Sequence, residues 1–97
     1  MAETVPFDLA KYLQNPAFAA EYLDAVVEEG DISEIRGAIR DLVLARGVAG
    51  VAKSTGLSRE AIYKAFGPKG NPTLATLLTV LKALNLRLSV TLAGDGR

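Results

Sequence analysis

Five polar or charged side chains between positions 58 and 64 are suited to reading a nucleic acid: Ser58, Arg59, Glu60, Tyr63 and Lys64. Arginine and lysine bind phosphates and guanine edges, while hydroxyl and carboxylate groups hydrogen-bond to bases or to the sugar-phosphate backbone. Positions 59, 60, 63 and 64 share one face of a helix, because residues three and four apart are neighbours there. The polar loop that follows adds three residues to the predicted DNA-binding set: Lys69, Asn71 and Thr73.

A helix-turn-helix would hold this face toward DNA. The motif needs a small residue where its two helices approach, a glycine in the turn and an apolar residue that anchors the second helix. Ala52, Gly56 and Ile62 supply these features in order, and they predict short helices at 48–54 and 59–66. The first turn of such a second helix enters the major groove. The alternative is a tight helical hairpin that does not bind DNA, since these residue types are common at loose spacing.

The sequence contains neither cysteine nor histidine. This absence excludes disulfides, thiol nucleophiles, the usual structural zinc ligands and the most common general base. We therefore predict no catalytic residue, no metal site and no cofactor, and we do not expect an enzyme.

The remaining elements must support the motif. Pro16 and Gly30 bound one predicted helix, Asp31 and Gly47 bound the next, and a short helix precedes Asn15. Thr73 caps a leucine-rich helix that ends near Asn85. Beyond it, apolar and polar residues alternate over 86–92 and predict one strand. Four apolar residues of this strand form the predicted dimerisation set: Leu86, Leu88, Val90 and Leu92.

A lone strand leaves its backbone groups unpaired, so antiparallel pairing with a second copy is expected. Two alternatives stay open: the tail lies as an extended segment on its own domain, or it docks on the sheet of a partner.

Together these elements predict a single all-α domain over residues 1–97. It consists of acidic N-terminal helices (1–31), a helix-turn-helix bundle (32–85) and a C-terminal β-strand (86–92). No apolar run is long enough to cross a bilayer, and the N-terminus does not have the pattern of a secretory signal. We therefore expect a cytoplasmic protein with no membrane association.

Charge is distributed unevenly along the chain. Residues 1–31 carry Lys11 against seven acidic residues, whereas residues 32–97 carry ten basic residues against four acidic ones. The C-terminal two-thirds is thus suited to a polyanion, and the N-terminal third to a basic partner or simply to solvent. We predict that six residues of the N-terminal third bind such a partner: Phe7, Tyr12, Tyr22, Asp24, Glu28 and Glu29.

A longer set of short motifs runs through the chain: Phe7-Asp8, Tyr12-Leu13, Gly30-Asp31, Ala45-Arg46-Gly47, Gly56-Leu57-Ser58-Arg59-Glu60, Tyr63-Lys64 and Asn71-Pro72-Thr73. With these motifs the chain resembles the HigA-like addiction-module antidotes, and residues 48–66 resemble the helix-turn-helix of the phage Cro and C1 repressors. The resemblance implies a Cro/C1 repressor-like five-helix bundle with additional N-terminal helices. It also implies an antitoxin of a type II toxin-antitoxin module, which neutralises a small basic toxin of the RelE/ParE type. Such an antitoxin represses its own operon as a homodimer on double-stranded operator DNA.

A stand-alone phage-type transcriptional regulator without a toxin partner is the alternative, and a pure interaction module that has lost DNA binding is a further one. One departure bears on both DNA-binding functions. Relatives of this fold often have a hydroxyl residue and a glutamine at the start of the first motif helix, where this chain has Ala49 and Gly50. A side-chain phosphate clamp is therefore missing, and we expect weaker DNA binding or an altered specificity.

Overall fold

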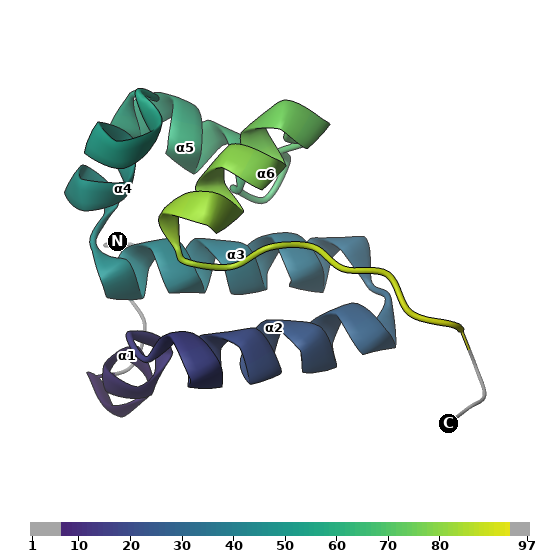
Figure 1. Cartoon of the computed structure of the whole chain (residues 1–97). Helices are drawn as coiled ribbons and strands as arrows, with labels where there is room; N and C mark the ends of the chain where they lie inside the picture. The colour runs from purple at the N-terminus through teal and green to yellow at the C-terminus, as the bar shows by residue number, and fades with distance from the viewer. Residues whose placement is uncertain (1–6, 94–97) are drawn as a thin grey trace.

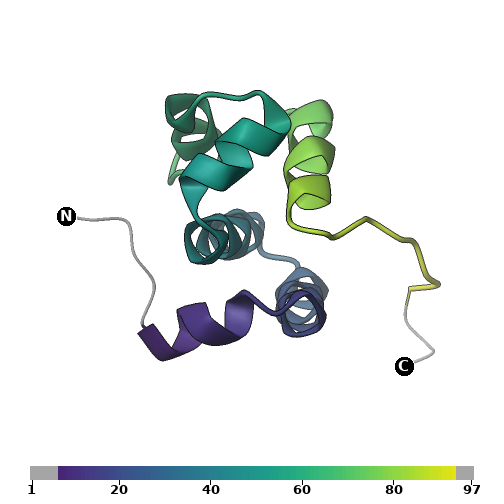
Figure 2. The ribbon, with the colours of Figure 1, turned by 60° about the vertical axis from the view of Figure 1, so that its left-hand side comes forward.

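The computed structural model describes residues 7–93, and its secondary structure is entirely helical. The six helices are α1 (Phe7–Leu13), α2 (Pro16–Glu29), α3 (Ile32–Arg46), α4 (Val48–Thr55), α5 (Arg59–Ala65) and α6 (Leu74–Ala83). Helices α2 and α3 lie side by side and form one layer, with α1 beside them at one end (Figures 1 and 2). Helices α4, α5 and α6 form a second layer on the other side of α3. None of these helices is long and apolar enough to cross a membrane.

The predicted helix boundaries are confirmed by their caps. Asn15 accepts a hydrogen bond from the amide of Ala17 (2.9 Å), and Asp31 accepts one from the amide of Glu34 (3.2 Å). Gly30 ends α2 in the left-handed conformation with φ 84°. These bonds satisfy amides that the first turn of a helix otherwise leaves without a partner. Local sequence therefore determines where the helices begin and end.

Helix α3 lies at the centre of the core. Five of its residues are buried, and α1, α2 and α4 all pack against it. The buried residues of the six helices and of the short links beside them form one apolar cluster, in which Phe66 and Ile62 are each 1% exposed. The N-terminal helices are therefore part of the same core as the C-terminal ones.

Two arginines of α3 reach across to the second layer. The guanidinium of Arg36 donates to the carbonyls of Pro68 (2.6 Å) and Gly70 (3.1 Å), in the loop between α5 and α6. The guanidinium of Arg46 donates to the carbonyl of Ala83 (3.0 Å) at the end of α6. Carbonyls at a helix end lack partners within the helix, so Arg46 supplies one.

The strand predicted over 86–92 is not formed in the single chain. Residues 86–93 form an extended segment, and no strand occurs within residues 7–93 (Figure 1). A strand requires a hydrogen-bonded neighbour, whereas backbone hydrogen bonding in the described residues ends where the amide of Leu86 donates to the carbonyl of Leu81 (2.8 Å). Asn85 turns the chain out of α6 with φ 65°, as predicted.

The six helices predicted from local sequence all occur within residues 7–93, but the five-helix bundle that the resemblance implies is corrected. Four of the helices, α3 to α6, fall inside the predicted bundle of residues 32–85. Helices α1 and α2 pack on α3 instead of standing outside a separate five-helix bundle.

Candidate functional site

Helices α4 and α5 are joined by a turn that is fixed by backbone and side-chain bonds. Gly56 adopts φ 78°, a left-handed conformation that favours glycine, and its amide donates to the carbonyl of Ala52 (2.9 Å). The hydroxyl of Thr55 donates to the carbonyl of Val51 (2.8 Å) and accepts from the amide of Leu57 (3.2 Å). Thr55 was not among the predicted site residues, although a threonine at a helix end often bonds to the backbone in this way.

Helix α5 is anchored on its inner face and open on its outer face. Ile62 lies in the core, and Phe66 follows the helix into the same cluster. The predicted residues Arg59, Glu60 and Lys64 are exposed, and Tyr63 is 36% exposed. The structure therefore brings these four predicted residues together on one helix with no charged group buried.

Two predicted DNA-binding hydroxyls act as helix caps. The Oγ of Ser58 accepts from the amide of Ala61 (2.9 Å) at the start of α5. The Oγ1 of Thr73 accepts from the amide of Thr76 (3.0 Å) and donates to the hydroxyl of Thr76 (3.1 Å). Both residues are exposed, but their hydroxyl oxygens already accept bonds that stabilise the helices.

The predicted residues Lys69 and Asn71 are exposed in the loop between α5 and α6. This loop passes close to α5: a Cβ atom on Gly70 would collide with the carbonyl of Ala65. Arg36 holds the loop from the other side through Pro68 and Gly70. Sequence reasoning missed Arg36, because its bonds span 32 and 34 positions and no local pattern marks them.

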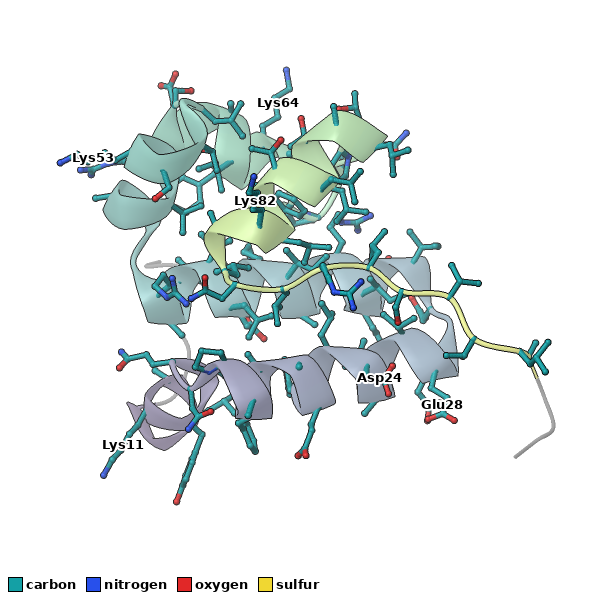
Figure 3. All side chains as sticks on the ribbon, viewed as in Figure 1. Lys11, Asp24, Glu28, Lys53, Lys64 and Lys82 are labelled. Carbon is teal, nitrogen blue, oxygen red and sulfur yellow. The ribbon has the colours of Figure 1, made fainter. Side chains whose placement is uncertain are left out.

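Opposite charges gather on α2 and on the layer of α4 to α6. Residues 48–85 carry one acid, Glu60, and five bases: Lys53, Arg59, Lys64, Lys69 and Lys82. Helix α2 carries no base and four acids: Glu21, Asp24, Glu28 and Glu29. Figure 3 shows Lys53, Lys64 and Lys82 on the layer of α4 to α6, and Asp24 and Glu28 on the opposite layer. Within residues 7–93 the acids form no group of three or more that could hold a metal ion.

The predicted toxin-binding residues occupy different surroundings. Tyr12 is 59% exposed, with its ring centroid 5.6 Å from that of Phe18, and Asp24, Glu28 and Glu29 are exposed on α2. The side chain of Phe7 lies outside the part that the structure describes.

Tyr22 differs from the other predicted residues because it is engaged inside the molecule. It is half-buried, and its hydroxyl donates to Oδ2 of Asp41 on α3 (3.1 Å). Burial raises the pKa of Tyr22 above its usual value of 10.0, and the charge and hydrogen bond of Asp41 raise it further. Tyr22 therefore links α2 to α3.

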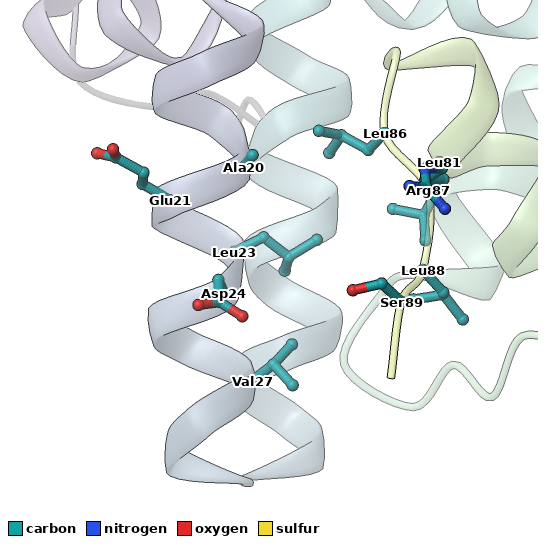
Figure 4. A pocket seen from close by; sticks show the side chains of 10 residues that line it. All are labelled: Ala20, Glu21, Leu23, Asp24, Val27, Leu81, Leu86, Arg87, Leu88 and Ser89. Atoms are coloured by element: carbon teal, nitrogen blue, oxygen red, sulfur yellow. The ribbon is translucent and has the colours of Figure 1, made fainter. Parts of the chain in front are cut away.

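The C-terminal segment lies beside α2. Leu86 is half-buried against the core, Leu88 is 52% exposed, and Val90 and Leu92 are each 96% exposed. Between this segment and α2 is a pocket of about 410 Å³ (Figure 4). The predicted dimerisation residues are thus divided: the first packs on its own chain, and the last two face solvent.

Comparison with known proteins identifies the family. The model of a family described as probable addiction module antidote protein matches residues 3–92. A protein of Haemophilus influenzae, described as uncharacterized, is 40% identical over 84 residues, which span 87% of each chain. No solved structure matches the chain. Because the family match includes both the acidic α2 and the basic α4 to α6, the chain belongs to the family of probable addiction module antidote proteins.

Proposed function

We propose that this antidote is the antitoxin of a type II toxin-antitoxin module, which neutralises a toxin of the RelE/ParE type and represses its own operon through α4 and α5. An antidote implies a toxin, so membership in the family supports the neutralising role and favours it over a stand-alone regulator. The resemblance to HigA-like antidotes supports the class of toxin.

DNA binding rests on one observation, the exposed face of α5. Because Ile62 and Phe66 are each 1% exposed, the helix is held firmly while Arg59 and Lys64 point to solvent. A helix fits the major groove of B-DNA, and its first turn meets the base edges. We assign α4 and α5 as a helix-turn-helix of the Cro/C1 type, with α5 as the recognition helix.

Phosphate contacts would come from the basic side chains around α5. Ala49 and Gly50 are exposed at the start of α4 and offer no side-chain donor. Lys53, Lys64 and Lys69 are exposed and can neutralise phosphates. We therefore expect the affinity for DNA to come mainly from salt-sensitive ionic contacts of these lysines, and less from hydrogen bonds donated by α4.

Repression would use a homodimer. Val90 and Leu92 leave almost their whole side chains in water, and the backbone after Leu86 forms no hydrogen bond within the described chain. Antiparallel pairing with the same segment of a second copy would supply hydrogen-bond partners for this backbone and would cover the two exposed side chains. A homodimer would present two recognition helices, and half-sites about 34 Å apart on DNA call for two such helices.

A binding experiment with the DNA upstream of the operon tests the proposal. If Arg59 contacts a base, Arg59→Ala weakens binding by about 1–3 kcal/mol and relaxes specificity at one position, whereas loss of a phosphate contact from Lys64 changes the salt slope by about one unit. Fluorescence anisotropy over a salt series measures both effects, and Lys11→Ala on α1 is the control. If the double alanine variant binds as tightly as the wild type at about 150 mM salt, α5 does not read the operator.

A further inference from the structure

The pocket between α2 and the C-terminal segment joins two parts of the chain that are far apart in sequence. We call it the α2 groove. Its lining from α2 is Ala20, Glu21, Leu23, Asp24 and Val27, and its lining from α6 and the C-terminal segment is Leu81, Leu86, Arg87, Leu88 and Ser89. Figure 4 shows Leu23 and Val27 directed from α2 toward the segment, and Leu86 and Ser89 directed back toward α2. The acidic helix and the tail, which the sequence offers as separate docking elements, thus form the walls of one groove.

The groove has an apolar floor that is only partly covered. Leu81 and Leu23 close its base, at 2% and 9% exposed, whereas Val27 remains 47% exposed and Leu88 52% exposed. Its volume of about 410 Å³ lies in the range of about 300–1,000 Å³ that is usual for sites that bind ligands. Beyond the Leu86 amide, the part of the tail that forms this wall (Arg87, Leu88 and Ser89) makes no backbone hydrogen bond within the described chain. An occupant would therefore cover exposed apolar side chains and could also pair with this backbone.

The rim of the groove is acidic. Asp24 lies on it against a single base, Arg87, while the carboxylate of Glu21 is directed away from the C-terminal segment (Figure 4). The exposed acids Glu28 and Glu29 continue the same helix. No ion pair engages Glu21 or Asp24 within residues 7–93. Carboxylates around an apolar floor favour an occupant that is both basic and apolar, because charge complementarity steers and aligns the partner.

A second copy of this chain fits the rim poorly. Its tail, residues 86–93, carries one charged residue, Arg87, which already lines the groove of its own chain. The antidote family implies a toxin as the other partner.

We propose that the α2 groove receives a basic, partly apolar segment of the toxin, with a cationic side chain at Asp24 and its apolar side chains over Val27 and Leu88. This assignment rests on the proposed antitoxin function. Of the six residues predicted from the sequence to bind the toxin, Asp24 lines this groove, and the assignment adds Val27 and Leu88.

Matched substitutions test the groove, with the product of the neighbouring gene of the operon as the toxin probe. Ala20→Trp fills the groove, whereas Ala25→Trp adds the same side chain at an exposed position of α2 outside it. Asp24→Lys reverses the rim charge, and Glu34→Lys in the first turn of α3 reverses an exposed acidic charge outside the lining. Titration calorimetry should give an affinity at least about tenfold weaker for the two groove variants, and within about twofold of wild type for the two controls.

Three outcomes overturn the proposal. Equal toxin affinity for Ala20→Trp and Ala25→Trp excludes the groove as the docking site. A change of Ala20→Trp from dimer to monomer in sedimentation, with toxin affinity retained, assigns the groove to a second copy. Failure of the wild-type chain to bind the neighbouring gene product contradicts the proposed antitoxin function, and the groove assignment with it. This result differs from failure of the groove assignment alone, in which the wild type binds and the groove variants bind equally well. Circular dichroism of each variant establishes that the helices are intact.

Discussion

Arg36 is the side chain that most directly positions the loop between α5 and α6. Its guanidinium bonds to the carbonyls of Pro68 and Gly70. A hydrogen bond from a charged group stabilises a fold by about 1.5–3 kcal/mol, and less where water competes. Because Arg36 is half-exposed, we expect Arg36→Ala to lower the free energy of unfolding by about 1–2 kcal/mol.

Urea denaturation measures this loss, and Arg59→Ala is the control. Arg59 is exposed on the outer face of α5, so its removal should change the free energy of unfolding by less than about 0.5 kcal/mol. Equal losses for the two alanine variants would mean that the bonds of Arg36 do not stabilise the loop.

Tyr22 gives a second prediction at the residue scale. The pH dependence of stability distinguishes the contribution of its hydroxyl from that of its ring. Tyr22→Phe keeps the ring but removes the bond to Asp41, so the free energy of unfolding should fall by about 0.5–1.5 kcal/mol near neutral pH. The pKa of Tyr22 is raised in the folded chain, so above pH 10.0 the unfolded chain releases a proton that the folded chain retains. The contribution of the hydroxyl is therefore complete below pH 10.0 and is lost as pH rises through the folded pKa.

Denaturation of both proteins from about pH 8 to about pH 11 measures their difference in the free energy of unfolding, and groups common to both proteins cancel. The difference should shrink above pH 10.0. A difference that stays constant or grows across this range would contradict the link between Tyr22 and Asp41.

At the scale of helices, α4 contains a residue that lowers its intrinsic stability. Gly50 is exposed in the first turn of α4. A Cβ atom there would have no atom within 4 Å other than those of its chain neighbours and of the backbone of its own helix. Alanine restricts the unfolded chain and favours the helix, so Gly50→Ala should raise the free energy of unfolding by about 0.5–1 kcal/mol.

Gly56→Ala is the matched comparison in thermal and urea denaturation. Gly56 has φ 78°, so alanine there should destabilise the turn by about 1 kcal/mol or more. If Gly50→Ala were as destabilising as Gly56→Ala, the start of α4 would have a constraint that its open surroundings do not reveal.

The sequence was sufficient for features that depend on a few neighbouring residues. The caps at Asn15, Asp31 and Ser58 are local, and each forms at the predicted helix start. The strand failed because alternation over 86–92 requires a neighbouring backbone that this chain does not provide within its described residues. The bond between Tyr22 and Asp41 spans 19 positions, so only the packing of α2 on α3 reveals it.

The same limit applies to the candidate sites. Periodicity correctly placed Arg59, Glu60, Tyr63 and Lys64 on the accessible part of α5, because the spacing of Ile62 and Phe66 fixes the inner face. No local pattern could reveal that the tail returns beside α2, and the α2 groove could not be predicted for that reason.

At the scale of the whole molecule, the tail beyond the groove should determine assembly. Deleting residues 90–97 keeps Leu86, which packs on the core, and the groove residues Leu88 and Ser89, but removes the exposed Val90 and Leu92. We expect the truncated chain to sediment as a monomer and to lose cooperative protection of two half-sites on its operator.

Replacing Leu78 by glutamine is the control, because this side chain is 43% exposed on α6 outside the tail. A truncated protein that remains a dimer with the same footprint would transfer the interface to α6 or to the N-terminal helices.

The separation of acids on α2 from bases on α4 to α6 also gives the molecule a dipole moment (Figure 3). The electric field of a polyanion such as DNA exerts a torque on this dipole. The protein therefore rotates before contact, so that the basic layer of α4 to α6 faces the DNA. Fewer encounters are then wasted on the wrong orientation, and association is faster at low ionic strength. In this orientation the α2 groove faces away from the DNA, so that a toxin could bind there while the DNA is bound.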